Sequence, residues 1–218
     1  MTSRERLLAA AKGKPTDQKP VILFDGGAQS DVLIVPPSRG VEIVSEQAVL
    51  VEILNPFGRA RRDSVDFNAE LAENPEIGNA KLDFYVAETQ LDIDRARESS
   101  VDGIFYRLVG AEPSLCTPMQ YGGYYLERDR ALLESIASAP LNVVFVDAGM
   151  EAYMDFVSDL PAAFFAWDID RSDYSVVQIR SMREGALAAE DPTADVLLAQ
   201  TLSQIDRWIM KQESPTHA

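Results

Sequence analysis

Short apolar runs recur along the chain at a spacing typical of strands that alternate with helices. Several of the runs have almost no polar interruption, as expected for parallel strands that are buried on both faces of a sheet. The runs cover residues 21–24, 32–35, 49–54, 103–108, 141–146, 162–167 and 185–189. The pattern therefore predicts seven strands.

Helix-length segments with one apolar face lie between the later runs. Two helices are predicted to begin at capping boxes, formed by Thr2 with Glu5 and by Thr117 with Gln120. The other predicted helices begin at residues 74–75, cover residues 149–158 and 172–183, and begin at residues 191–192, where Leu198, Thr201, Ile205 and Trp208 follow at helical spacing. Strands and helices that alternate in this way predict right-handed βαβ units, in either a (βα) barrel or an open doubly wound sheet.

The chain has 218 residues, which suits one domain, and a formal net charge of −15. This charge argues against binding to nucleic acid, because contacts to phosphates need a basic face. No run of 18 apolar residues is present, and charged residues stand where a secretory signal carries its apolar stretch, so no membrane partner is expected. The single cysteine, Cys116, fits a reducing compartment, and a cytoplasmic location is predicted.

Few residues could hold a metal or a cofactor. The chain contains one cysteine and one histidine, His217, so the cysteine and histidine ligands of a zinc site cannot be assembled. It also contains no Walker loop and no GxGxxG motif for phosphates. We therefore expect neither a metal nor an organic cofactor.

Four groups of residues occur in a characteristic order. They are TSRERLLAA (2–10) followed by KPV (19–21), SDVLIVP (30–36) with GVE (40–42), NPF (55–57) with LAENPE (71–76), and VDGIFY (101–106) with TP (117–118). In this order and spacing they resemble the opening helix and the first four strands of the uroporphyrinogen decarboxylase superfamily. The resemblance covers residues 2 to about 137, with a looser fit at residues 185–192.

The resemblance favours a TIM-type (βα) barrel with its site at the C-terminal ends of the strands. It implies a decarboxylase that removes carboxyl groups from the acetate arms of a tetrapyrrole without metal or organic cofactor. Relatives in the superfamily transfer methyl groups instead, often with a histidine and cysteine zinc site, for which this chain lacks the residues. Because the substrate implied by the resemblance carries carboxyl groups, an anionic small molecule is the expected substrate.

Asp31 occupies the position of the essential aspartate of this family, where a carboxylate would stabilise positive charge on a protonated pyrrole. The alternative for Asp31 is a carboxylate that makes a turn or caps backbone N–H groups at the start of a strand. Asp31 is accordingly the predicted catalytic residue.

Guanidinium groups are needed to bind carboxylates, and five arginines follow predicted strands. Arg107 ends an apolar strand, and Tyr106 beside it either contributes a phenol or, as we prefer, packs in the barrel wall. The other four arginines are expected in loops, where they either bind substrate or form a solvated charged surface: Arg39, Arg59, Arg61 and Arg62.

Two parts of the family pattern are absent. Only residues 25–29 separate the first predicted strand from Ser30, where the family has a helix and an arginine-rich loop, and the last βα unit is missing. Residues 1–218 are thus expected to form one α/β domain with an incomplete barrel of about seven βα units. The edge left by the missing unit needs a cover, so we expect a homodimer, formed through the last helix. A non-catalytic binding or assembly protein that keeps the barrel is the alternative function.

Overall fold

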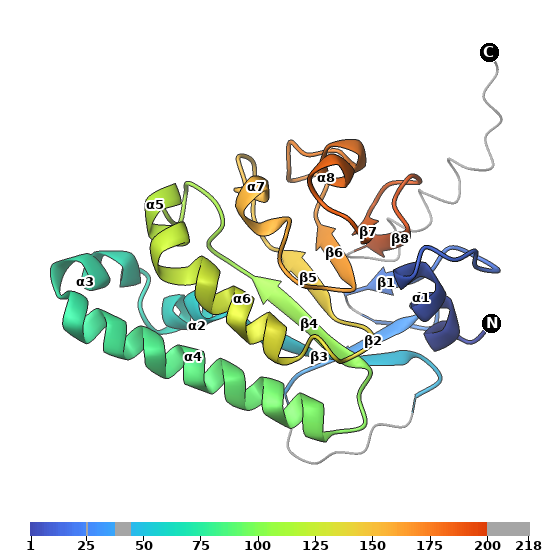
Figure 1. Ribbon diagram of the computed structural model, residues 1–218, viewed down its shortest axis with the longest axis horizontal. Helices are drawn as coiled ribbons and strands as arrows, with labels where there is room; N and C mark the ends of the chain where they lie inside the picture. Colours follow the sequence, from blue (N-terminus) through green and yellow to red (C-terminus); the bar gives the residue numbers. More distant parts are fainter. Residues whose placement is uncertain (25, 38–44, 200–218) are drawn as a thin grey trace.

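The computed structural model describes residues 1–24, 26–37 and 45–199 of the chain. Eight parallel strands, in the order β1-β8-β7-β6-β5-β4-β3-β2, curl into a nearly closed barrel (Figure 1). The predicted TIM-type (βα) barrel is therefore confirmed. The strands are β1 (Val21–Leu23), β2 (Val32–Val35), β3 (Ala48–Leu54), β4 (Gly103–Leu108), β5 (Val143–Val146), β6 (Phe164–Trp167), β7 (Ala186–Ala189) and β8 (Val196–Ala199).

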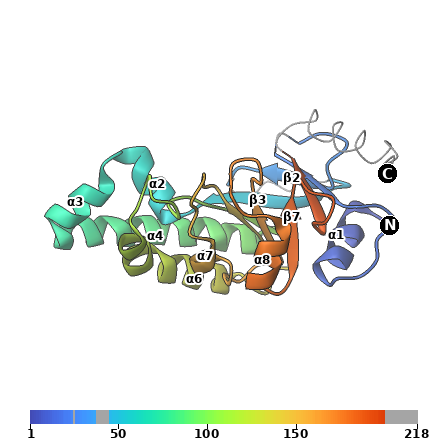
Figure 2. The same cartoon turned by 90° about the horizontal axis from the view of Figure 1, so that it is seen from above.

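Helices α4, α6 and α8 lie along one side of the sheet, and α3 with the first half of α4 extends beyond it (Figure 2). The helices are α1 (Ser3–Ala11), α2 (Pro56–Asp63), α3 (Phe67–Glu73), α4 (Pro75–Glu98), α5 (Pro118–Gln120), α6 (Leu126–Ser135), α7 (Met154–Val157) and α8 (Val176–Met182), with a π-helical turn, η1 (Tyr121–Tyr125), between α5 and α6. Both predicted capping boxes form, at Thr2 and at Thr117. No helix of the described residues is long and apolar enough to cross a membrane.

Side chains alternate between the inside and the outside of the barrel, as the pleat of a strand requires. The inner cluster includes Leu50, Phe105 and Phe145, and it is closed at the N-terminal end of the barrel by Leu7 and Ala10 of α1. A larger cluster lies between the outer face of the sheet and the helices. The inner cluster therefore runs from α1 towards the C-terminal ends of the strands, where the site of such a barrel is expected.

The eighth strand corrects the sequence-based prediction of seven strands and a last helix from residue 191. β8 pairs with β1 and with β7, so it fills the gap that a missing unit would have left. The Asp191 carboxylate accepts hydrogen bonds from both the amide and the hydroxyl of Thr193, which makes a turn instead of a helix start. The part of the predicted last helix from residue 200, including Trp208, lies outside the described residues.

Three predicted helices are confirmed in outline, and one predicted loop is wrong. α4 begins at Pro75 and buries Leu82, Thr89 and Ile93 as its periodicity indicated. α7 and α8 are shorter than the helices predicted at residues 149–158 and 172–183. The segment with Arg59, expected to be a loop, is helix α2, capped by Asn55.

Four strands share one device at the N-terminal end of the barrel. The residue just before each of them is an aspartate or asparagine whose side-chain oxygen accepts a hydrogen bond from a backbone N–H of the neighbouring strand. The pairs are Asp31 with Val21 at 2.9 Å, Asp102 with Val49 at 2.9 Å, Asn142 with Ile104 at 3.2 Å and Asp195 with Leu187 at 2.8 Å. These side chains extend the sheet hydrogen bonding beyond the strand starts.

Asp31 also closes the seam between β1 and β2, which no ladder joins within the described strands. Its amide donates to the carbonyl of Val21 at 2.7 Å, and the Ser30 hydroxyl accepts from the amide of Leu23 at 3.1 Å. The buried Asp31 carboxylate forms an ion pair with Arg6 of α1. One carboxylate thus connects both strands at the seam to the helix that closes the barrel.

We expect Asp31→Ala to lower the free energy of unfolding by about 1–3 kcal/mol, because it leaves Nη1 of Arg6 and the part-buried N–H of Val21 without their acceptor, although Arg6 keeps its ion pair with Asp17. Asp31→Asn keeps the acceptor and should lose less. Urea unfolding measures both, with Asp66→Ala as the control, since Asp66 is exposed and its side chain caps nothing. An Asp31→Ala variant as stable as the control would contradict this role.

Candidate functional site

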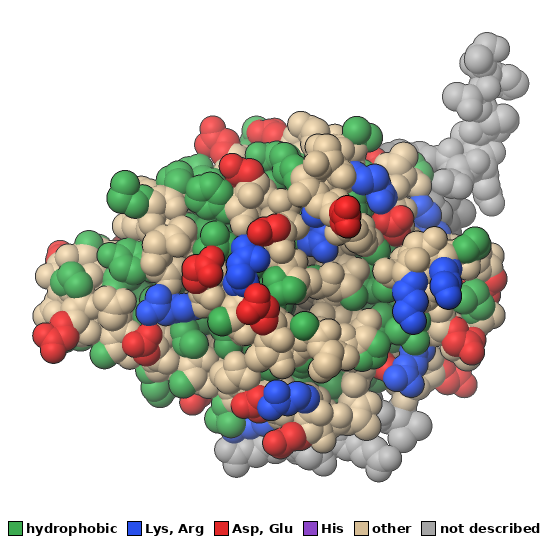
Figure 3. Space-filling model, in the orientation of Figure 1, with side chains coloured by type: hydrophobic (Ala, Val, Ile, Leu, Met, Phe, Trp, Pro, Cys, Tyr) green, Lys and Arg blue, Asp and Glu red, His purple; other side chains and the backbone are tan. Residues whose placement is uncertain are grey.

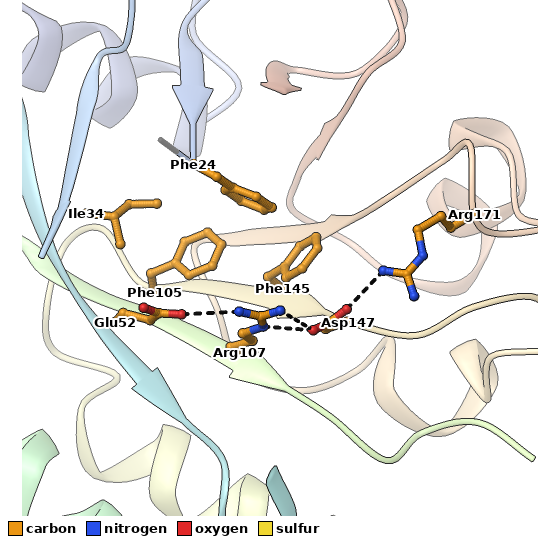
Figure 4. Close-up of a pocket in the computed structure, with 8 residues that line it drawn as sticks. All are labelled: Phe24, Ile34, Glu52, Phe105, Arg107, Phe145, Asp147 and Arg171. Carbon is orange, nitrogen blue, oxygen red and sulfur yellow. Dashed lines mark hydrogen bonds and ion pairs between the residues drawn. The ribbon is translucent and has the colours of Figure 1, made fainter. Parts of the chain in front are cut away.

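A cavity of about 290 Å³ opens at the C-terminal end of the barrel (Figure 4). Half of its lining is apolar and half is charged. The lining residues are Phe24, Ile34, Glu52, Phe105, Arg107, Phe145, Asp147 and Arg171. This is the end of the barrel at which TIM-type proteins bind their ligands.

The alternation of the strands explains the lining. Phe105 and Phe145 belong to the inner cluster, and Arg107 and Asp147 follow two residues later on the same face of the sheet. Glu52 follows the inward-facing Leu50 of β3 in the same way. The inner face therefore changes from apolar to charged at the C-terminal ends of three adjacent strands.

Three phenylalanines form the apolar floor of the cavity. The rings of Phe105 and Phe145 are stacked with centroids 5.7 Å apart, and Phe24 meets both edge-on, at 5.2 and 4.8 Å. Ile34 of β2 lies beside them (Figure 4). A flat apolar or aromatic group would find a matching surface here.

Four charged side chains form a row of alternating sign along one wall (Figure 4). Arg107 Nε and Nη2 lie 2.7 and 2.6 Å from Asp147 Oδ2, and Arg107 Nη1 lies 3.6 Å from Glu52 Oε1. Arg171 Nη1 donates to Asp147 Oδ1 at 3.2 Å. Asp147 is thus held between two guanidiniums, while Arg171 and Glu52 end the row with side chains 54% and 40% exposed.

A smaller hollow adjoins the cavity and shares Phe24 and Phe145 with it. Its further lining includes Asp168 and Glu190, which lie at the ends of β6 and β7. The two hollows together therefore present more carboxylates than guanidiniums. On the face of the molecule drawn in Figure 3, acidic and basic side chains are interspersed.

Asp31, the predicted catalytic residue, lies at the other end of the barrel. It precedes Val32, which is level with Ala48 at the start of β3, whereas Arg107 is level with Leu54 at the end of that strand. At 3.3 Å per residue, these levels are roughly 20 Å apart. The contacts of Asp31 favour the structural alternative, a carboxylate that caps backbone at a strand start, and its catalytic role stays a prediction.

Of the predicted arginines that the structure describes, Arg107 alone lines the cavity. Arg59 forms an ion pair with Asp92 of α4 at 2.6 Å. Arg61 and Arg62 are half-buried and exposed, respectively, on α2, and neither lines the cavity. Arg39 lies outside the described residues.

Tyr106 points away from the barrel interior into the outer cluster, where it is fully buried. Its hydroxyl donates to the Asp129 carboxylate at 2.7 Å, and Tyr121 donates to the same carboxylate at 3.2 Å. Burial raises the pKa of Asp129 to about 7, although these hydrogen bonds and one from Asn55 act in the opposite direction. The wall-packing alternative for Tyr106 therefore agrees with its position.

Sequence reasoning did not place Glu52, Asp147 or Arg171 in the site. The period of two along each strand would have placed Glu52 and Asp147 on the same inner face as Arg107. Arg171 reaches Asp147 from the loop after β6. No pattern in the sequence identifies that contact, because a loop brings Arg171 to the cavity.

The described residues contain no group of three or more histidine, cysteine, aspartate or glutamate side chains placed to hold a metal ion. Cys116 is buried outside the barrel, and burial raises the pKa of its thiol to about 11. His217 lies outside the described residues. A thiolate metal site is therefore not supported by the part of the chain around this cavity.

Comparison with known proteins gives a likeness of fold. No family model matches the sequence, and no curated protein matches it. The solved structure of a methyltransferase from Methanosarcina mazei is similar, with a TM-score of 0.73 over 98% of this chain and 98% of that chain. The two sequences are 12% identical, so the likeness supports a shared TIM-barrel fold and assigns no activity.

The raised pKa of Asp129 predicts how the stability of the fold depends on pH. Since its pKa is about 7 in the folded state and close to 4 when unfolded, the folded protein binds one more proton between these values. Stability should therefore fall as pH rises through this window, with a slope that approaches about 1.4 kcal/mol per pH unit. The lowered pKa values of Glu5 and Glu70 act only near pH 4 and below.

Urea unfolding between about pH 5 and pH 8 measures this slope. Asp129→Asn should flatten it, whereas the exposed Asp66→Asn should leave it unchanged. An unchanged slope in Asp129→Asn would show that the carboxyl is not the titrating group.

Proposed function

We propose that the protein binds a small cyclic carboxylate with ring N–H donors, of the carboxylated pyrrole type, and decarboxylates it. The observation that carries the proposal is the row Glu52, Arg107, Asp147 and Arg171 above the phenylalanine floor. A ring would lie on Phe105 and Phe145, with its carboxylate at the exposed guanidinium of Arg171. The mixed charge of the row suits a ligand that has both an anionic group and N–H donors better than it suits a simple polyanion.

Decarboxylation of a pyrrole acetate replaces the carboxyl group by one proton. A proton added to a ring carbon places positive charge on the ring, and the electrons of the C–C bond enter the ring as carbon dioxide leaves. The exocyclic carbon then takes up a proton while the ring carbon releases one. What the protein must supply is a carboxylate that stabilises the positive ring.

We assign this task to Glu52 rather than to Asp31. Glu52 lines the cavity, and among the described residues its ionic contact is the long 3.6 Å approach to Arg107. Asp147 is neutralised by two guanidiniums and is better suited to position Arg107 and Arg171. The resemblance to uroporphyrinogen decarboxylases supports the reaction, and the methyltransferase neighbour leaves methyl transfer as the competing activity of the same fold.

The test is anaerobic incubation with uroporphyrinogen and, separately, with a monocyclic pyrrole acetate, followed by chromatography of the products. Stepwise loss of carboxyl groups supports the proposal. Binding without turnover supports the alternative of a ligand-binding protein, and neither binding nor turnover contradicts both.

With an active substrate, Glu52→Gln should lower kcat by about 100-fold with little change in KM, because it removes a charge needed only when the ring is positive. Arg171→Ala should raise KM by about tenfold through the loss of a charge-assisted hydrogen bond. Arg97→Ala is the matched control, since Arg97 is similarly exposed on α4. Unchanged kinetics in Glu52→Gln would remove Glu52 from the mechanism.

A further inference from the structure

The outer face of α4 carries a row of exposed apolar side chains. Ile77, Phe84 and Leu91 are 56%, 59% and 42% exposed and are spaced seven residues apart. Ala80 and Ala87, also exposed, lie between them. Spacings of three and four residues in alternation are those of the a and d positions of a coiled coil. The row, which we call the α4 seam, extends over roughly 21 Å at 1.5 Å per residue.

The α4 seam is distinct from the face through which α4 joins its own domain. Leu82, Thr89, Ile93 and Ala96 are buried on the opposite side of the helix, where α4 contacts α2, α3 and α6. A helix with apolar residues on both sides is expected to be covered on both. A phenylalanine and two long aliphatic side chains exposed in register along one helix therefore indicate an interaction surface.

We propose that the α4 seam pairs with the α4 seam of a second copy of this chain, in an antiparallel, twofold-symmetric contact. In one register large and small side chains alternate across the contact, so that Phe84 meets the partner's Ala87 and Leu91 meets the partner's Ala80. The twofold axis repeats both pairs, which gives four matched layers from two kinds of contact. Small residues opposite large ones allow the two helices to approach closely.

The charges beside the seam favour the same register. Lys81 of one chain lies next to the partner's Glu88, and the twofold axis forms this pair twice. Glu88 has no hydrogen bond or ion pair with any described residue. Lys81 donates to Glu70 at 2.7 Å and has two further N–H donors. A parallel pairing in register would instead place Glu88 beside the partner's Asp83, which is repulsive.

Sedimentation velocity of the full-length protein over a range of concentrations tests the proposal. We expect a reversible equilibrium between the 24.0 kDa chain and its dimer. Phe84→Glu should raise the dissociation constant by about 30-fold or more, because it places a charge at the centre of the seam. Met119→Glu is the matched control and should leave it unchanged, since Met119 is 86% exposed on α5, away from the seam.

A charge exchange tests the register. Glu88→Lys should weaken the dimer by about tenfold, and the double variant Lys81→Glu with Glu88→Lys should restore it. All three substituted side chains are exposed, so each variant is expected to keep the fold. Thermal unfolding of each variant checks this. A monomer at every concentration, or a dimer that Phe84→Glu does not weaken, would overturn the proposal. If another protein, and not a second copy, binds the α4 seam, this chain alone should be a monomer at every concentration, which would also overturn the proposal.

Discussion

Closure of the barrel at the seam between β1 and β2 is the constraint on which the rest of the structure depends. Seven of the eight strand contacts are backbone ladders, but at this seam the connection is too short for a helix and no ladder forms among the described residues. Ser30 and Asp31 supply the missing hydrogen bonds with their side chains, and Arg6 of α1 forms an ion pair with Asp31. Because the barrel closes here, Phe24 and Ile34 come to lie on the same cavity as residues from β4 and β5.

The two ends of the barrel use the same residue types for different purposes. At the N-terminal end, carboxylates accept hydrogen bonds from backbone N–H groups and pair with arginines of α1, as Asp31 does with Arg6 and Asp102 with Arg4 at 2.6 Å. At the C-terminal end, Glu52 and Asp147 accept no hydrogen bond from a backbone N–H of the described residues, and both face the cavity. A carboxylate that ends a strand in a barrel is thus a candidate for chemistry, whereas one that precedes a strand is a candidate for closure.

This difference explains what the sequence could and could not predict. Apolar runs located seven strands, since burial on both faces leaves few polar residues in them. β8 was missed because its Leu198 also fitted a helical period with Ile205 and Trp208. The recurrence of Asp-Val-Leu at residues 31–33 and 195–197 was the available signal, because both mark the start of a strand that pairs with β1 or contacts it at the seam.

The candidate site was less predictable than the fold, for a physical reason. Arg107 was identified because it ends a strand, but the side chains that decide its chemistry lie on β3, just after β5 and in the loop after β6, far apart in sequence. Those side chains change the interpretation of Arg107, since an arginine that is already paired with Asp147 attracts an anionic ligand less strongly than an unpaired arginine would. A cavity of about 290 Å³ is also near the lower limit for ligand pockets, so it would enclose one ring and its carboxylate while a larger ligand extends outward. Charge balance and size together therefore favour recognition of one substituted ring at a time over capture of a whole polyanion.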